Sequence, residues 1–156
     1  EMLKGMKKKK LTIIKSNDGS VMHALKKNEY EFIGFGEAYF STVNYNSIKA
    51  WKLHTKMTLN LIVPSGEVLF YFLDNRKDSS SYNKFEKITL SEKNYFRLTV
   101  PPNIWFGFKG ISRNVSIILN IADMIHDPDE VLRKNLDEID VAWTIKNKDN
   151  ITGHIN

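Results

Sequence analysis

The sequence has 156 residues, of which 42% are hydrophobic and 26% charged, the balance of one globular domain with its own core. It contains no cysteine, which excludes disulfide frameworks, thiolate nucleophiles and cysteine-ligated zinc or iron–sulfur sites. The net charge of +5 owes much to one lysine run, Lys7 to Lys10, and no basic stripe interleaved with aromatic residues follows, so we expect no nucleic-acid partner.

The first thirty residues carry little pattern and are expected to form an N-terminal arm, residues 1–30. The apolar stretch Leu11 to Ile14 is too short for a secretory signal, and no small-residue cleavage site follows it. The longest apolar runs, Leu59 to Pro64 and Val68 to Leu73, are far shorter than the roughly 20 residues of a membrane helix. We therefore expect a cytoplasmic protein with no membrane partner.

From Tyr30 onward, short segments rich in β-branched and aromatic residues alternate with turn-forming residues, the pattern of an all-β sandwich or barrel. The Pro64-Ser65-Gly66 step between two apolar runs predicts a hairpin whose flanking strands pair antiparallel. The predicted strands are Glu37 to Val43, Ile48 to His54, Met57 to Val63, Glu67 to Leu73, Phe85 to Leu90, Tyr95 to Val100, Ile104 to Lys109 and Val115 to Ile121.

Two further segments have a clear local character. Asn75 to Asn83 is polar and rich in turn formers, so it is expected to be a surface loop. Asp127 suits a helix N-cap and Pro128 the first helical position, and two carboxylates follow, which predicts a short helix to about Lys134. The last residues, 144–156, are expected to form a frayed tail without function.

Three motifs together resemble one known family: Leu53-His54 at the end of a strand, then Gly66-Glu67-Val68, then Pro101-Pro102 followed by Trp105-Phe106-Gly107-Phe108. The sequence resembles the dTDP-4-dehydrorhamnose 3,5-epimerase family over roughly Glu37 to Trp143. It is most similar to a short-chain branch found in gene clusters for cell-surface polysaccharide. The resemblance implies a single cupin-type antiparallel β-barrel, or jelly roll, over residues 1–156, with a short C-terminal helix and no cofactor.

Many cupins bind a metal through two histidines and a glutamate on one strand pair and a third histidine on a later strand. The corresponding positions here are Lys52, His54, Leu59 and Phe106. A lysine and two apolar side chains cannot ligate a divalent ion, so no metal site is expected. The epimerase family that the chain resembles needs none.

That family removes a proton from a carbon beside a C4 ketone and returns a proton from the opposite face, with a histidine base, an orienting aspartate and a tyrosine acid. The resemblance places His54 at the base position and Asp137 near the orienting aspartate. An imidazole suits the role because its ordinary pKa, about 6.5, lets it exchange a proton near neutrality. The position of the acid falls at Leu119 or Asn120, where there is no tyrosine.

The remaining pocket candidates depend on strand alternation. Lys52 and Lys56 flank His54 at even spacing, so on a regular strand all three face one side; alternatively the strand ends at His54 and Lys56 has reached solvent. A buried Lys52 would need an anionic partner, either a phosphate-bearing ligand or a carboxylate such as Glu67. Tryptophans are expected in the core rather than as sugar-stacking platforms. The candidate substrate-binding residues are Lys52, Lys56, Asn60, Trp105, Phe106 and Asn120.

Two functions compete. The first is an epimerase or isomerase acting on a nucleotide-linked 4-keto sugar in surface polysaccharide biosynthesis, with His54 as base. The second is a non-catalytic module that binds a carbohydrate or nucleotide sugar and has lost the tyrosine acid. A homodimer is expected in either case, because members of this family exchange an N-terminal strand and thereby cover exposed strand edges.

Overall fold

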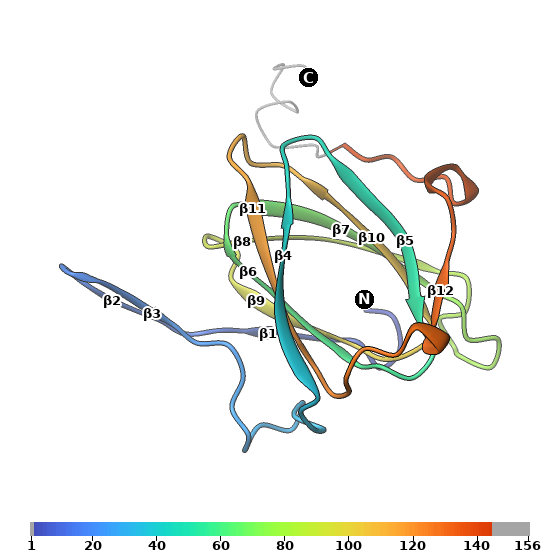
Figure 1. Ribbon diagram of the computed structural model, residues 1–156, viewed down its shortest axis with the longest axis horizontal. Coiled ribbons are helices and arrows are strands. Elements are labelled where there is room, and N and C mark those ends of the chain that lie inside the picture. Colours follow the sequence, from blue (N-terminus) through green and yellow to red (C-terminus); the bar gives the residue numbers. More distant parts are fainter. Residues whose placement is uncertain (1, 145–156) are drawn as a thin grey trace.

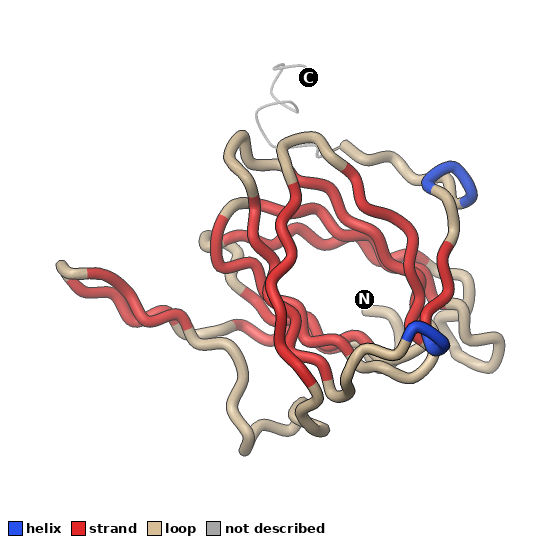
Figure 2. Tube along the Cα trace, in the orientation of Figure 1, coloured by secondary structure: helices blue, strands red, loops and turns tan. Residues whose placement is uncertain are grey.

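Two five-stranded antiparallel sheets face each other in the computed structural model, which describes residues 2–144 (Figures 1 and 2). One sheet has the strand order β1-β9-β6-β11-β4 and the other β12-β5-β10-β7-β8, while β2 and β3 form a separate hairpin. This arrangement confirms the all-β, cupin-type prediction. The strands are β1 (Lys7–Lys10), β2 (Ile13–Ser16), β3 (Gly19–Met22), β4 (Glu37–Val43), β5 (Ile48–His54), β6 (Leu59–Ser65), β7 (Glu67–Asp74), β8 (Phe85–Ser91), β9 (Phe96–Val100), β10 (Ile104–Gly110), β11 (Ser116–Ala122) and β12 (Val131–Arg133).

All eight predicted strands are present, and β4 and β5 have the predicted bounds. The largest difference is at β6, which begins at Leu59 rather than at Met57. The amides of Met57 and Thr58 donate hydrogen bonds to the side chains of Glu130 and Asp123, so they do not take part in the sheet ladder. This short detour of the chain belongs to the candidate site described below.

The predicted hairpin between β6 and β7 is wrong. The chain does turn tightly there, with Gly66 at a φ of 86°, but β6 pairs with β9 and β11 while β7 pairs with β8 and β10 in the opposite sheet. A Cβ at Gly66 would lie 2.2 Å from Ser116 Oγ, so the close approach requires glycine. The turn carries the chain from one sheet to the other because both strands bury one face in the same core.

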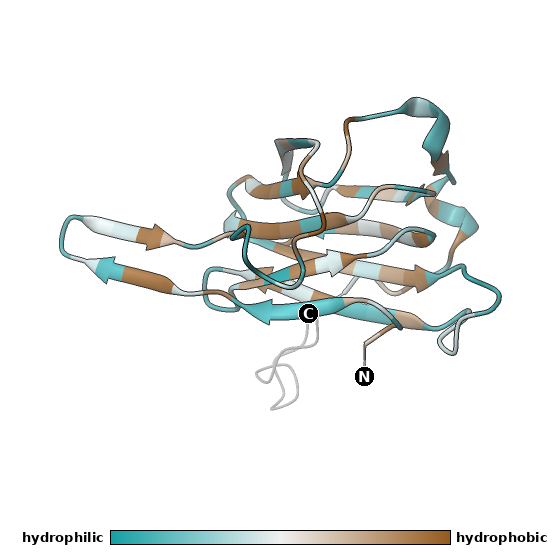
Figure 3. Ribbon diagram, turned by 90° about the horizontal axis from the view of Figure 1, so that it is seen from below, coloured by the Kyte–Doolittle hydropathy of each residue, from teal (hydrophilic) through white to brown (hydrophobic). Residues whose placement is uncertain are grey.

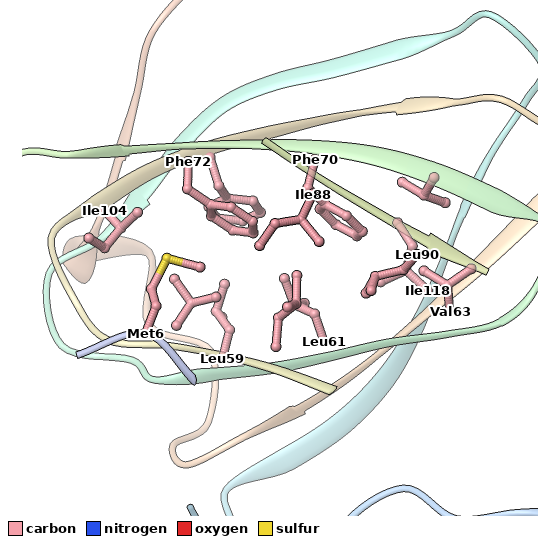
Figure 4. Packing of buried hydrophobic residues seen from close by; sticks show 14 of the residues in the cluster. Met6, Leu59, Leu61, Val63, Phe70, Phe72, Ile88, Leu90, Ile104 and Ile118 are labelled. Carbon is pink, nitrogen blue, oxygen red and sulfur yellow. The ribbon is translucent and has the colours of Figure 1, made fainter. Parts of the chain in front are cut away.

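That core fills the space between the sheets (Figure 4). Its members alternate along the strands, as a half-buried sheet requires. They include Leu59, Leu61 and Val63 of β6, Val68, Phe70 and Phe72 of β7, and Ile88, Leu90, Ile104 and Ile118 from the neighbouring strands.

A second cluster covers the outer face of the sheet that contains β5. Trp51, Leu53 and Trp105 belong to it, and Trp143 packs against Trp51 with a distance of 5.4 Å between ring centroids. The three tryptophans therefore pack together in this cluster. Because Leu53 points outward into this cluster, its neighbours Lys52 and His54 point inward.

The N-terminal segment is more than an arm. Leu3 and Met6 are buried in the core between the sheets, and β1 pairs with β9 at the edge of a sheet. The four lysines of β1 are exposed, which discourages pairing of this edge with another chain. Beyond β1, the β2–β3 hairpin projects from the barrel (Figures 1 and 3).

Buried Arg97 ties the segment after the hairpin to the barrel. Its guanidinium donates to the carbonyl oxygen of Ala24 and to the carboxylates of Glu29 and Glu31. Burial alone would raise the pKa of Glu29, but hydrogen bonds from Lys9, the Lys26 amide and Arg97 outweigh it and lower this pKa to about 2. The ion pairs therefore keep Glu29 charged beside a guanidinium that has no contact with solvent.

The predicted C-terminal helix is wrong in extent. Asp127 is the N-cap, since its side chain accepts a hydrogen bond from the Asp129 amide, and Pro128 is the first helical residue. The helix is only one 3-10 turn, Pro128–Glu130, and the chain then extends as β12 along the edge of β5. A second 3-10 turn, Leu136–Glu138, follows.

Asn75 to Asn83 is a loop without strands, as predicted. Buried Asp74 organises its start by accepting hydrogen bonds from Arg76, Ser79 and Ser81.

Within residues 2–144 there is no helix long and apolar enough to cross a membrane.

Candidate active site

A cavity of about 650 Å³ lies between the two sheets, a volume typical of small-molecule sites. Its wall combines apolar and aromatic side chains with several charged and polar groups, and it draws on both sheets and on the segment after β12. The lining residues are Tyr39, Ser41, Lys49, Ala50, Trp51, Lys52, Leu59, Leu61, Phe70, Phe106, Phe108, Ile118, Asn120, Arg133, Lys134, Asn135 and Glu138.

A buried polar contact beside this cavity joins His54 to Glu130. His54 Nδ1 lies 2.5 Å from Glu130 Oε2, and both side chains are buried, with 6% and 1% of their surfaces exposed. The other carboxylate oxygen of Glu130 accepts the backbone amides of Lys56 and Met57, each at 2.9 Å. Glu130 thus has a partner for each oxygen, and its position relative to the imidazole is fixed.

The surroundings favour the charged form of Glu130 and the neutral form of His54. Burial would raise the pKa of Glu130, but the hydrogen bonds from His54, Met57 and Lys56 outweigh it and lower this pKa. Burial lowers the pKa of His54 below its ordinary value, and the opposing pull of Glu130 does not fully compensate. At neutral pH the pair is therefore a carboxylate and a neutral imidazole. Because the carboxylate can only accept, Nδ1 carries the proton and Nε2 has a free lone pair.

His54 adjoins the cavity without being part of its wall. It lies on the same face of β5 as Lys52, which lines the cavity, and its ring stacks on Phe106, also a lining residue, with 6.0 Å between centroids. Phe106 therefore lines the cavity and also packs against the imidazole.

Cations gather on one side of the cavity. Lys52 lines it, as expected, and Arg133 is its partner in the ladder between β5 and β12. Burial, followed by repulsion from Arg133 and Lys49, lowers the pKa of Lys52. Lys49 and Lys134 line the same cavity, although the Lys134 ammonium also lies over the Trp105 ring. The structure adds Lys49, Arg133 and Lys134 to the predicted Lys52. Arg133 and Lys134 were not expected there because β12 was not predicted.

Asp137 does not orient His54, contrary to expectation. It lies in the exposed 3-10 turn Leu136–Glu138, and no hydrogen bond joins it to His54 in the part of the chain that the structure describes. The contact belongs to Glu130, which sequence reasoning had placed in the first turn of a helix. The short turn and β12 instead bring this carboxylate alongside the end of β5.

Three predicted substrate-binding residues lie outside the cavity wall. Lys56 is exposed and contributes only its backbone amide to Glu130. Trp105 belongs to the outer cluster. Asn60 is buried, with its side chain bonded to Thr99 and to the Ile121 carbonyl oxygen.

Asn120 does line the cavity, and it brings with it a residue that the sequence interpretation missed. Its Nδ2 donates to the hydroxyl of Tyr39, which is its partner across the ladder between β4 and β11, at 3.0 Å. Tyr39, Ser41 and Val43 are spaced two apart along β4 and share one face, and Val43 is buried. This alternation could have indicated that Tyr39 faces inward. Within residues 2–144, no three His, Asp or Glu side chains are grouped as metal ligands.

Comparison with known proteins gives a consistent result. Residues 2–156 match the family model described as dTDP-4-dehydrorhamnose 3,5-epimerase. The dTDP sugar isomerase of Desulfovibrio desulfuricans G20 superposes with a TM-score of 0.87 at 31% identity, over 90% of this chain and 92% of that one.

Two curated relatives are more distant in sequence. The probable low-salt glycan biosynthesis epimerase Agl13 of Haloferax volcanii is 27% identical over 107 residues, 66% of this chain and 68% of the relative. The spore coat polysaccharide biosynthesis protein SpsL of Bacillus subtilis is 24% identical over 135 residues, 86% of this chain and 89% of the relative. With the fold, the cavity and the whole-length match in agreement, the chain belongs to the dTDP-4-dehydrorhamnose 3,5-epimerase family.

Proposed function

We propose that this protein is a cytoplasmic isomerase that epimerises a nucleotide-linked 4-keto sugar during the biosynthesis of a surface polysaccharide. The observation that carries the proposal is the buried pair of His54 and Glu130 beside a cavity with cationic walls. The names of the glycan and spore coat relatives support the pathway, and the family supports the nucleotide sugar.

In this proposal His54 is the base. Its Nε2 takes the proton from a carbon next to the C4 ketone, and the electron pair moves to the ketone oxygen as an enolate. Glu130 holds the imidazole in the tautomer that leaves Nε2 free, and its charge stabilises the imidazolium that forms. The lowered pKa of His54 keeps the base unprotonated at neutral pH.

The cations would receive the charged part of the substrate. Lys52 and Arg133 lie side by side on paired strands, and their two cationic groups would bind the phosphates of a nucleotide diphosphate. The apolar and aromatic wall formed by residues such as Phe106 and Phe108 would enclose the sugar and exclude water.

The alternative is a binding module without catalysis. It is favoured by the absence of tyrosine from β11, where Ile118, Leu119 and Asn120 stand around the position of the family's acid. A module of this kind would bind a nucleotide sugar saturably, and the binding would not be followed by proton exchange.

Solvent deuterium exchange separates the two functions. The purified protein is incubated in D₂O with 4-keto-6-deoxy sugars linked to dTDP, UDP, GDP or CDP, and deuterium at the carbons beside the ketone is followed by NMR and mass spectrometry. We expect time-dependent incorporation with at least one donor. Saturable binding of a donor with no incorporation would support the binding module and contradict the epimerase.

We also propose a homodimer. The β2–β3 hairpin projects from the barrel and exposes Ile14 and Val21, and Phe40 is 69% exposed on the edge strand β4. Burial of these groups by a second copy would remove apolar surface and an open strand edge from water. Light scattering is expected to give twice the chain mass of 18.1 kDa. A mass of one chain at micromolar concentration would contradict the dimer.

A further inference from the structure

The cavity contains a second polar pair, on the sheet opposite His54. Tyr39 of β4 and Asn120 of β11 face each other across the ladder, and both line the cavity. Asn120 is 3% exposed, whereas Tyr39 is 38% exposed. The hydroxyl therefore lies where both a ligand in the cavity and solvent can reach it.

The hydrogen bonds of Asn120 fix the orientation of its amide. The Asn60 backbone amide donates to Asn120 Oδ1 at 3.1 Å, and a backbone N–H can only donate. The Nδ2 group must then face Tyr39, to whose oxygen it donates. Because the phenol oxygen accepts this bond, its own proton stays available, and in residues 2–144 the Tyr39 hydroxyl donates to no other group.

This geometry suits a proton donor. After the hydroxyl loses its proton, the phenolate would still accept the N–H of Asn120, and the contact would strengthen with the charge. The family's tyrosine position falls at Leu119 or Asn120, and of these two Asn120 lines the cavity. Tyr39 is the ladder partner of Asn120, so it lies beside that position. A hydroxyl from β4 can thus occupy the space that a tyrosine on β11 would fill.

We infer that Tyr39 is the acid that completes the epimerisation, with Asn120 as its positioning residue. The inference rests on the proposed function. The enolate formed by His54 collapses to the C4 ketone as its carbon takes the proton of the Tyr39 hydroxyl, on the face opposite the imidazole. The products are the inverted carbon, a Tyr39 phenolate and a His54 imidazolium. Proton exchange with water then restores both groups.

The test separates proton removal from inversion. In D₂O with a reactive donor, Tyr39→Phe is expected to keep deuterium incorporation, because His54 still removes the proton and can return deuterium to the same face. Inverted product is expected to fall by about 10²-fold or more, the usual contribution of a general acid. The matched control is Tyr82→Phe, which alters a tyrosine of similar exposure, 41%, outside the cavity wall.

A second variant tests the positioning role. Asn120→Asp keeps an oxygen for the Asn60 amide but replaces the N–H that faces Tyr39 by an acceptor, so the hydroxyl donates its proton to the new carboxylate. Loss of inversion with retained exchange is expected again, and thermal unfolding of each variant identifies any general loss of structure.

Three results would overturn the inference. Wild-type inversion by Tyr39→Phe would remove its role as acid and leave the proposed function intact. Loss of exchange together with inversion, in a folded Tyr39→Phe protein, would show that Tyr39 does not act in the second proton transfer. Absence of exchange by the unmodified protein with every donor would remove the proposed function and the inference together.

Discussion

Replacing His54 by asparagine is expected to lower deuterium incorporation into a 4-keto nucleotide sugar by roughly 10²- to 10⁴-fold, the range for loss of a general base. Asparagine is the informative choice because its amide can still donate to Glu130 Oε2, the contact that the imidazole makes at 2.5 Å. The buried carboxylate thus keeps a partner, and the substitution removes the lone pair of Nε2. Exchange is measured by NMR at saturating donor.

Donor binding distinguishes the loss of a base from the loss of the site. The proposed phosphate contacts belong to Lys52 and Arg133, so calorimetry is expected to give His54→Asn nearly the dissociation constant of the unmodified protein. His23→Asn, which changes a histidine outside the wall of this cavity, is the control and should exchange normally. Exchange by His54→Asn at the rate of the unmodified protein would exclude His54 as the base.

The strands of the barrel, and the residues that point into it, could be predicted because side chains alternate between the two faces of a strand. Lys52 and His54 do share the inner face of β5, as even spacing indicated. The strand pairing of β6 and β7 could not be predicted in the same way. A turn signal indicates only that the chain reverses direction. Such a reversal occurs both in a hairpin and where the chain crosses from one sheet to the facing sheet. The apolar runs on both sides are equally suited to face each other across a core.

Glu130 escaped prediction for a related reason. The segment Asp127 to Glu130 has the composition of a helix start, and the structure does begin a helical turn there. A long-range contact ends this turn: Val131 pairs with His54 at the open edge of β5. Tyr39 could not be predicted from the family pattern, because that pattern has its tyrosine on β11, whereas this hydroxyl comes from the neighbouring strand β4.

The role of Glu130 can be tested against that of Asp137, the carboxylate expected from the sequence. Glu130→Gln is expected to lower exchange by about 10³- to 10⁴-fold, through the wrong tautomer of the base. The amides of Lys56 and Met57 require an oxygen at the position of Oε1, so the new NH₂ group must face His54. It would donate to Nδ1, move the ring proton to Nε2, and leave no lone pair for the substrate.

Nitrogen-15 chemical shifts of the imidazole report this change without reference to activity. The proton is expected on Nδ1 in the unmodified protein and on Nε2 in Glu130→Gln, while Asp137→Asn should resemble the unmodified protein in both shifts and exchange. The opposite pattern, with activity lost in Asp137→Asn and kept in Glu130→Gln, would restore Asp137 as the orienting group.

The pH dependence of deuterium exchange tests the roles of both His54 and Glu130. Burial lowers the pKa of His54, and Glu130 partly opposes that shift through its hydrogen bond and its charge. The unprotonated base is the active form, so exchange by the unmodified protein should persist below pH 6.5, the ordinary imidazole value, and fall only as the lowered pKa is passed. Removal of the Glu130 charge takes away the opposing effect, so the residual activity of Glu130→Gln should fall at a still lower pH. A shift to higher pH would mean that Glu130 does not stabilise the imidazolium.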